Sequence, residues 1–566
     1  MATFASYTSL GPTDKSKVSS ALQSIILAGA GARDRVPLIQ VLLDDVADGR
    51  GRIGQKETGQ ALLAAKVLAR VPEGAQVFGQ TKNLRAFLKV IKSVSLPADA
   101  QTEAMRCVAN ALLLVPSARE EWISIGGADA CIDILDRDSY GPETYFPAAR
   151  IVYLITVART PYILKMVDQY RIVDTLSRRL ESIFDNFPIS QPWTKEALTD
   201  LLKLTFNMTL QYPRMIDETP GGSNRVLGEL WDDKFAVIVP TLLRLYHGLP
   251  PTSVPLTAPL THVIHVLLNV PVEPFTTLFF PSQGSPTGSS HGSAGPSPNG
   301  SSAHPPESFG QRALNYLQRR SISSDKHPFI GRRSSPQPST DAFKRSMDLL
   351  DSALAHYFPA SDREITEPDD LKVRLMAKKE DVNVDEALSP LVLFIQRLIA
   401  GNEHVRERIR TVLLPPDLDR SVPLQRRPDL VGRLVRLLTS VHMPRLKDAV
   451  GEMLYAMCDA NAEQLASAIG YGNVAGFLFN KGIMIPPPDS GDNGVNPITG
   501  TTSSSSSSNH TSSAPPIVDM DTPMTEEEKE AEAERLFVLF DRLERSGYGV
   551  NPVRRAQQEG RFQEIE

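Results

Sequence analysis

Gly470, Gly472 and Ala475 have the spacing of a dinucleotide-binding turn, in which backbone amides contact a pyrophosphate. That chemistry also requires a preceding strand inside a βαβ unit. Here the flanking strings, EQLASA and VAGFLFNKG, look helical. We therefore interpret the glycines as a turn between two helices. The sequence contains no GxxxxGK(S/T) phosphate loop, no HExxH zinc motif and no CxxC pair.

Histidines and cysteines are the other candidates for chemistry. His262 and His265 lie three residues apart on a predicted helix, and without a nearby acid or thiol they are more typical of structural residues than of metal ligands. Cys107, Cys131 and Cys458 are too few and too scattered for a disulfide framework or a four-thiolate metal site. Cys107 is interpreted as a small core residue. We predict no catalytic residue, no metal and no cofactor.

Composition and charge narrow the class of protein. The chain has 566 residues, of which 41% are hydrophobic and 22% are charged, enough for several ordinary domains. Its formal net charge of -6 lacks the basic excess of nucleic-acid binders, so we predict no nucleic-acid partner. No apolar run approaches the roughly 18 residues of a membrane helix, and the N-terminus lacks a signal-peptide pattern. We expect a soluble, cytoplasmic protein.

Two tracts rich in Gly, Pro and Ser divide the chain, and such a composition buries too little apolar surface to fold. In the first tract, Ser323 and Ser335 each follow an arginine by three residues, which makes them candidate phosphorylation sites. We predict an N-terminal repeat domain (1–280), a disordered insert (281–340), a second repeat domain (341–484), a flexible linker (485–521) and an acidic amphipathic helix with a tail (522–566).

Apolar residues recur with helical periodicity almost everywhere outside these tracts. A helical run ends near a proline at five comparable places, Pro72, Pro116, Pro161, Pro213 and Pro271. The first two steps between them fall within the roughly 40–47-residue period of armadillo and HEAT repeats. Such helices bury their apolar faces only by stacking on neighbours. We predict an all-α, armadillo/HEAT-like, right-handed superhelical solenoid.

A polar stripe appears when these helices are aligned on their prolines. The positions ten, six and two residues before the proline share one helix face, and most of them are polar or basic. In a solenoid the last helix of each repeat lines the concave side, so the stripe predicts a groove for an anionic peptide, although a solvated face is the alternative. The predicted groove residues are Lys66, Arg70, Arg106, Asn110, Lys203, Asn207, His265 and Asn269.

The segment after the second tract begins with a strong helix start, because Thr525 and Glu528 have the spacing of a capping box. Further along, apolar residues form one stripe on an acidic helix. This helix could fold back on the solenoid or dock on a partner. Its predicted contact residues are Leu536, Phe537, Phe540 and Leu543.

Several blocks in matching order carry a specific resemblance to one family. Among them are TEAMRCVANALLLVPSARE (102–120), LTHVIHVLLNVPVE (260–273), IGYGNVAGFLFNKGIM (469–484) and MTEEEKEAEAERLFVLFDRLERSG (524–547). The chain resembles the synembryn family, and its long Ser-rich insert resembles that of a fungal member. The resemblance implies an exchange factor and folding chaperone for heterotrimeric G-protein α subunits, which grips the C-terminal helix of its partner and stabilises the nucleotide-free state.

The same resemblance implies roles for individual residues. The family's groove positions fall on Lys66, Arg70, Arg106 and Asn110, and in the second domain on the stretch around Arg406, which Glu403 and Glu407 make less basic. We expect a monomer that is recruited to the plasma-membrane cortex through the α subunit. A plain α-solenoid adaptor that binds acidic peptides without causing exchange is the alternative.

Overall fold

The computed structural model describes residues 4–29, 34–48, 51–217, 230–281, 340–361 and 364–484. The chain divides into two compact units, 1–503 and 504–566, and all described residues belong to the first unit. Within these ranges the regular structure is helical, apart from one isolated bridge between Ala360 and Ile365. The predicted contact residues Leu536, Phe537, Phe540 and Leu543 lie outside the described residues, as do Ser323 and Ser335.

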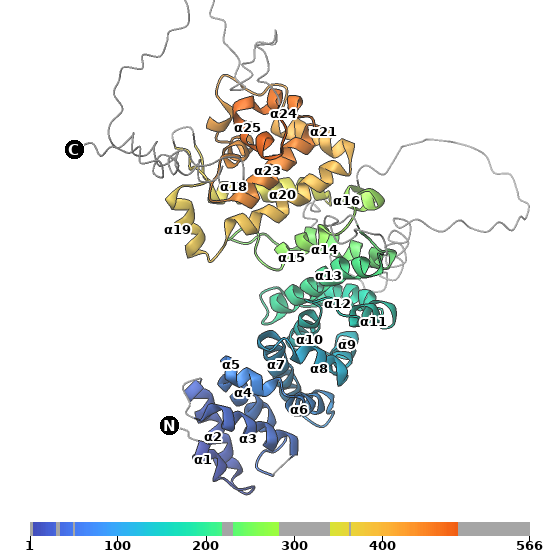
Figure 1. Cartoon of the computed structure of the whole chain (residues 1–566), viewed down its shortest axis with the longest axis vertical. Coiled ribbons are helices and arrows are strands. Elements are labelled where there is room, and N and C mark those ends of the chain that lie inside the picture. The colour runs from blue at the N-terminus through green and yellow to red at the C-terminus, as the bar shows by residue number, and fades with distance from the viewer. Residues whose placement is uncertain are drawn as a thin grey trace, which may run out of the picture. The chain divides into compact units, whose positions relative to one another are not determined.

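The helices before the insert form a long succession (Figure 1). They are α1 (Phe4–Thr8), α2 (Lys15–Ala28), α3 (Arg35–Asp48), α4 (Thr58–Leu68), α5 (Pro72–Phe78), α6 (Thr81–Lys92), α7 (Ala98–Leu114), α8 (Ala118–Ser124), α9 (Gly127–Asp136), α10 (Pro142–Ile155), α11 (Tyr162–Asp168), α12 (Ile172–Asn186), α13 (Thr194–Ile216), η3 (Asp233–Ile238), α14 (Val239–Gly248), α15 (Leu260–Leu267), η4 (Glu273–Phe275) and α16 (Thr276–Phe279).

The succession continues after the insert. These helices are α18 (Ala342–Tyr357), α19 (Leu371–Lys379), α20 (Val384–Ala400), α21 (Glu403–Leu413), η6 (Leu424–Arg426), α22 (Leu430–Leu437), α23 (Pro444–Met457), α24 (Ala462–Ile469) and α25 (Tyr471–Asn480). None of the described helices combines the length and the apolar character needed to cross a bilayer.

Repeats of three helices organise this part of the chain, as in α5–α6–α7, α8–α9–α10 and α11–α12–α13. The third helices pack on one another in the order α4, α7, α10, α13, α15, α20, α23, and the second helices pack in the order α3, α6, α9, α12, α14, α18, α22. Each helix buries its apolar face against its neighbours in the series, which is the packing of an α-solenoid. The predicted all-α, armadillo/HEAT-like solenoid is confirmed.

The helices on either side of residues 282–339 belong to the same stack. Helix α14 packs on α18 and α15 packs on α20. The hydroxyls of Tyr246 and Ser346 are 2.7 Å apart in a buried hydrogen bond, and Arg397 donates to the carbonyl oxygen of Val270 over 3.3 Å. The core therefore continues from the repeats before the insert into those after it.

Four of the five prolines used for the repeat alignment lie between helices or begin one, but Pro213 does not. Helix α13 runs through Pro213 and ends three residues later, at Ile216, so it also ends near its proline. A single proline removes only one helical hydrogen bond. Buried Tyr212 fixes this turn, since its hydroxyl lies 2.7 Å from Asp168 Oδ1 and its ring packs edge-on against Phe235.

Two interpretations of the sequence are confirmed at the level of single residues. Gly470 joins α24 to α25 with a φ of 94°, in the region that favours glycine, and Gly472 and Ala475 lie at the start of α25, so the string is a helix–turn–helix connection. Cys107 is fully buried beneath Leu62, and burial raises the pKa of its thiol. Cys131 and Cys458 are also buried and free. A buried neutral thiol acts as a small hydrophobic residue.

Candidate binding surface

The third helices carry the predicted stripe, and part of it is open to solvent. We call four open residues the stripe surface: Lys66 on α4, Arg70 just after α4, and Arg106 and Asn110 on α7. Arg70 is exposed and the other three are partly buried. Lys203 on α13 and His265 on α15 are also partly open. The third helices therefore present polar side chains to solvent from α4 to α15.

On α10 the stripe does not coincide with the open face. Ile151 and Ile155 are buried, and the partly open positions are Arg150 and Tyr153. The proline alignment assumed a constant distance from the end of the helix to the proline. Helix α7 ends two residues before its proline, whereas α10 ends six residues before Pro161, so that distance is not constant.

Asn207 and Asn269 lie inside the protein rather than on its surface. The Asn207 amide donates to Thr156 Oγ1 over 3.0 Å, and the Asn269 amide donates to Thr209 Oγ1 over 3.0 Å. Both residues are buried. Buried amides need such partners, so these two residues join successive repeats and do not belong to the open surface.

Glu103 neutralises part of the stripe surface. Its carboxylate accepts hydrogen bonds from Lys66 Nζ on the preceding third helix and from Arg106 Nη1 on its own helix. The Arg106 guanidinium also lies 4.4 Å from the centre of the Trp193 ring and 3.4 Å from Glu143. The bases are thus held in place by an acid and an aromatic ring. Lys66 and Arg106 share one acid, so this part of the predicted groove is less basic than the sequence indicates.

A second group of this kind joins α10 to α13. Asp200 is fully buried, and its carboxylate lies 2.8 Å from Arg150 Nε and 3.6 Å from Lys203 Nζ. Burial raises the pKa of Asp200, and the two bases oppose that shift. Arg150 also stacks on Phe146 at 4.5 Å, and Lys203 lies 5.6 Å from the Tyr153 ring.

Sequence reasoning missed these acids, although a signal for them exists. Glu103 precedes Arg106 by three residues and Asp200 precedes Lys203 by three residues. Residues three apart on a helix are neighbours. An acid three residues before a basic residue of the stripe therefore indicates that the two side chains form an ion pair. The partners on other helices, such as Trp193 and Arg150, become visible only after folding.

His262 and His265 lie together on α15, with ring centres 5.6 Å apart. His265 is also 6.4 Å from the Phe206 ring. Burial, together with Lys203 and His265, lowers the pKa of His262 to about 4, and burial lowers the pKa of His265. Among the described residues no group of histidine, cysteine and acidic side chains is arranged to hold a metal ion. Because both pKa values are lowered, His262 and His265 are neutral at physiological pH.

Acidification from pH 7 to pH 5 is expected to destabilise the protein through His262 and His247. Burial, reinforced by Arg345, lowers the pKa of His247 to about 4. Both pKa values lie below the ordinary value of about 6.5, so the unfolded chain binds more protons as the pH falls from about 6.5 toward 4. Between pH 7 and pH 5, each histidine should lower the free energy of unfolding by about 1 to 2 kcal/mol.

Urea unfolding at both pH values measures this loss. The His247→Phe and His262→Gln double variant should lose less stability on acidification than the unmodified chain. His404→Gln is the control, because that side chain is 75% exposed. An equal loss in the double variant would show that other groups cause the pH dependence.

Arg406 lies elsewhere in the stack, on α21, which packs on α20 and α23. It pairs with Asp459, which also accepts from Arg410, and these two bases lower the pKa of Asp459. The structure does not bring Arg406 into contact with the stripe surface. Arg406 instead lines a separate open hollow of about 370 Å³ beside Tyr455 and Lys481.

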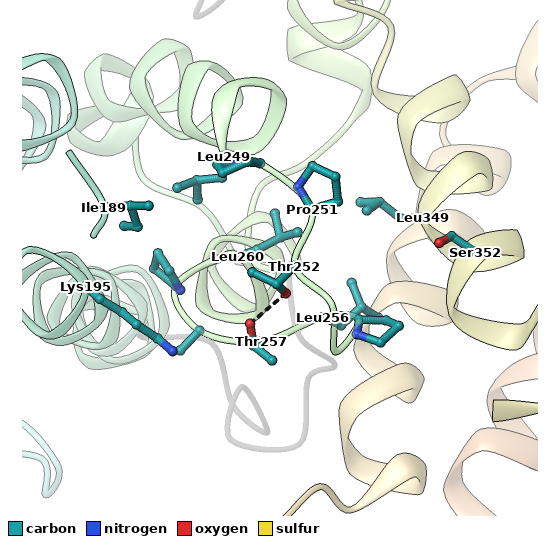
Figure 2. Close-up of a pocket in the computed structure, with 14 residues that line it drawn as sticks. Ile189, Lys195, Leu249, Pro251, Thr252, Leu256, Thr257, Leu260, Leu349 and Ser352 are labelled. Atoms are coloured by element: carbon teal, nitrogen blue, oxygen red, sulfur yellow. Dashed lines mark hydrogen bonds between the residues drawn. The ribbon is translucent and has the colours of Figure 1, made fainter. Parts of the chain in front are cut away.

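A small pocket lies in the loop between α14 and α15 (Figure 2). Its volume is about 180 Å³, and its walls are mainly prolines and leucines from residues 249–260 with Leu349 opposite. Thr252 and Thr257 hydrogen-bond to each other across 3.0 Å, and Lys195 is the one titratable residue among those that line it. One base among apolar side chains offers no acid and base pair for catalysis.

Comparison with known proteins shows which family the chain resembles. A family model described as guanine nucleotide exchange factor synembryn matches residues 61–561. Chaperone Ric-8A of Mus musculus is 21% identical over 94% of this chain and 85% of its own. Chaperone Ric-8 of Drosophila pseudoobscura pseudoobscura is 28% identical over 31% of this chain and 32% of its own. A crystal structure of an engineered protein covers 82% of this chain and 91% of its own, with 13% identity and a TM-score of 0.41.

Proposed function

Because the chain belongs to the family described as guanine nucleotide exchange factor synembryn, we propose that it is an exchange factor and folding chaperone for heterotrimeric G-protein α subunits. The observation that carries this proposal is the family match, which extends over residues 61–561. The mouse and fly relatives are both named as chaperones. We propose that the chain acts as a monomer in the cytoplasm and reaches the membrane cortex through its partner.

The proposed mechanism is differential binding, and no bond is made or broken by the protein. The chain must bind the nucleotide-free α subunit more tightly than the GDP-bound form. Nucleotide then weakens the complex by the same factor, because coupling between two binding sites is reciprocal. GDP leaves, the nucleotide-free form is held, and GTP binding releases it.

We propose that the stripe surface contacts the C-terminal helix of the α subunit. Lys66, Arg70 and Arg106 supply positive charge, and the half-buried Asn110 supplies an amide on the same side of α7. A helix that presents carboxylates could accept hydrogen bonds from these groups. Glu103 holds two of the bases before the ligand arrives. Outside the described residues, we propose Leu536, Phe537, Phe540 and Leu543 as a second contact with the α subunit.

GDP release from a purified α subunit tests this function. With GTP in excess, substoichiometric amounts of the full chain should accelerate release of labelled GDP, because GTP frees each molecule to act on many α subunits in turn. The control is the same chain after heat denaturation. If the protein binds the α subunit without changing the release rate, it is an adaptor that recognises acidic peptides, and the exchange proposal fails.

A further inference from the structure

Helix α19 differs from its neighbours in how little of it is buried. Only Val373 among its nine residues is buried. The helix packs against α18, and in Figure 1 it lies at the edge of the helices that follow the insert. Its sequence, LKVRLMAKK, contains four basic residues and no acid. The helix therefore combines weak packing with positive charge along its own length, between the acids Asp369 and Asp370 before it and Glu380 and Asp381 after it.

Two leucines on α19 face solvent. Leu371 is 61% exposed and Leu375 is 57% exposed. They are four residues apart, so they share one face of the helix. At the N-terminal end of the helix, Asp369 accepts hydrogen bonds from Ser440 Oγ and from the backbone amides of Val441 and His442. That anchor holds in place a loop whose Val441 side chain is also exposed.

The bases on α19 are mostly unpaired. Lys372 is 2.8 Å from Glu364, and both side chains are exposed. In the ranges that the structure describes, Arg374, Lys378 and Lys379 have no acidic partner within 4.0 Å. The arginines of α21 are different, because Arg406, Arg408 and Arg410 each pair with an aspartate. The positive charge of α19 is thus available to an anionic partner.

From this combination we propose that α19 binds the surface of an anionic lipid membrane. An amphipathic helix with leucines on one side and bases around them lies in the plane of the headgroups, with its apolar side chains directed inward. Leu371 and Leu375 would enter the headgroup region, and Arg374, Lys378 and Lys379 would contact lipid phosphates. Several bases near an anionic leaflet strengthen such binding.

The exposure of α19 favours a lipid surface over an acidic peptide. Peptide-binding sites enclose anchor side chains in grooves. On α19 both leucines project from a helix that contributes one buried residue, so they are placed to enter a deformable surface. The inference is independent of the proposed exchange function, because it needs no α subunit.

Vesicle co-sedimentation of the full chain tests the proposal. The protein should sediment with vesicles of phosphatidylcholine containing phosphatidylserine and remain in solution with phosphatidylcholine alone. The Leu371→Ser and Leu375→Ser double variant should bind the anionic vesicles about tenfold more weakly, as should the Lys378→Gln and Lys379→Gln variant. Because these side chains are exposed, the variants should keep the unfolding temperature of the unmodified chain.

Two control variants match these changes elsewhere on the chain. The Leu27→Ser and Val94→Ser pair removes two other exposed apolar side chains, and the Lys89→Gln and Lys92→Gln pair removes two charges from α6. Both controls should bind vesicles as the unmodified chain does. Equal vesicle binding by all four variants would overturn the proposal. Binding of polyglutamate that depends on the α19 residues, without vesicle binding, would also overturn it and would assign the face to an acidic protein.

Discussion

Replacing both Lys66 and Arg70 by glutamine is expected to weaken binding of a peptide from the C-terminal helix of the α subunit by about tenfold or more. The two cations lie on the open side of α4 and of the turn that follows it, and each charge-assisted hydrogen bond to a carboxylate contributes more than a neutral one. A tenfold change corresponds to about 1.4 kcal/mol. Titration of the full chain with labelled peptide measures the dissociation constant directly.

The matched control removes charges from another layer of the solenoid. Arg85→Gln with Lys89→Gln changes two bases on α6 and should leave the peptide affinity unchanged. If both double variants weaken binding equally, the peptide senses only the overall charge of the protein, and the stripe surface is not its site.

The counterpart of this experiment is Glu103→Gln. Removing that carboxylate frees Lys66 and Arg106 from their shared acid and should tighten peptide binding by about threefold to tenfold. Melting of the variant in the absence of peptide controls for damage to the fold. Unchanged affinity, with the fold intact, would mean that the peptide does not use these two bases.

Arg179→Leu is expected to destabilise the protein by about 1 to 3 kcal/mol, because it leaves the buried Leu135 carbonyl without its donor. The Arg179 side chain is 1% exposed. Its guanidinium donates to the Leu135 carbonyl, to the Tyr145 hydroxyl and to Asp138. These bonds join α12 to the end of α9 and to α10. Denaturant unfolding of the purified variant measures the loss.

The adjacent arginine supplies the control. Arg178 also pairs with an acid at the end of α9, Asp136, but its side chain is 46% exposed. Water screens such a pair, so Arg178→Leu should cost less than about 1 kcal/mol. Similar losses in the two variants would show that the bonds of Arg179 to buried atoms contribute nothing beyond its charge.

The solenoid could be predicted because its cause is local. Apolar residues at helical spacing and prolines near helix ends are visible in the sequence, and both reflect repeats that bury their helices on neighbours. The exact end of each helix was less predictable, because α13 runs three residues past Pro213, where Tyr212 is hydrogen-bonded to Asp168.

The candidate site was less predictable, because surface chemistry depends on which charges meet after folding. The stripe identified Lys66 and Arg106, but their shared acid, Glu103, is largely buried. The same rule placed Asn207 and Asn269 on the surface, yet each lies inside and bonds to a threonine of another helix. A polar residue on a helix face is compatible with solvent or with a polar neighbour, and the sequence alone does not distinguish the two.

The hydrogen bonds of Asn207 and Asn269 also have a mechanical consequence. Because each third helix packs on the next, a force applied along the series passes through every joint in turn. Apolar contacts resist separation of two helices but do little to oppose sliding, whereas a directional bond from amide to hydroxyl resists sliding as well. The joints from α10 to α13 and from α13 to the end of α15 should therefore be stiff in shear.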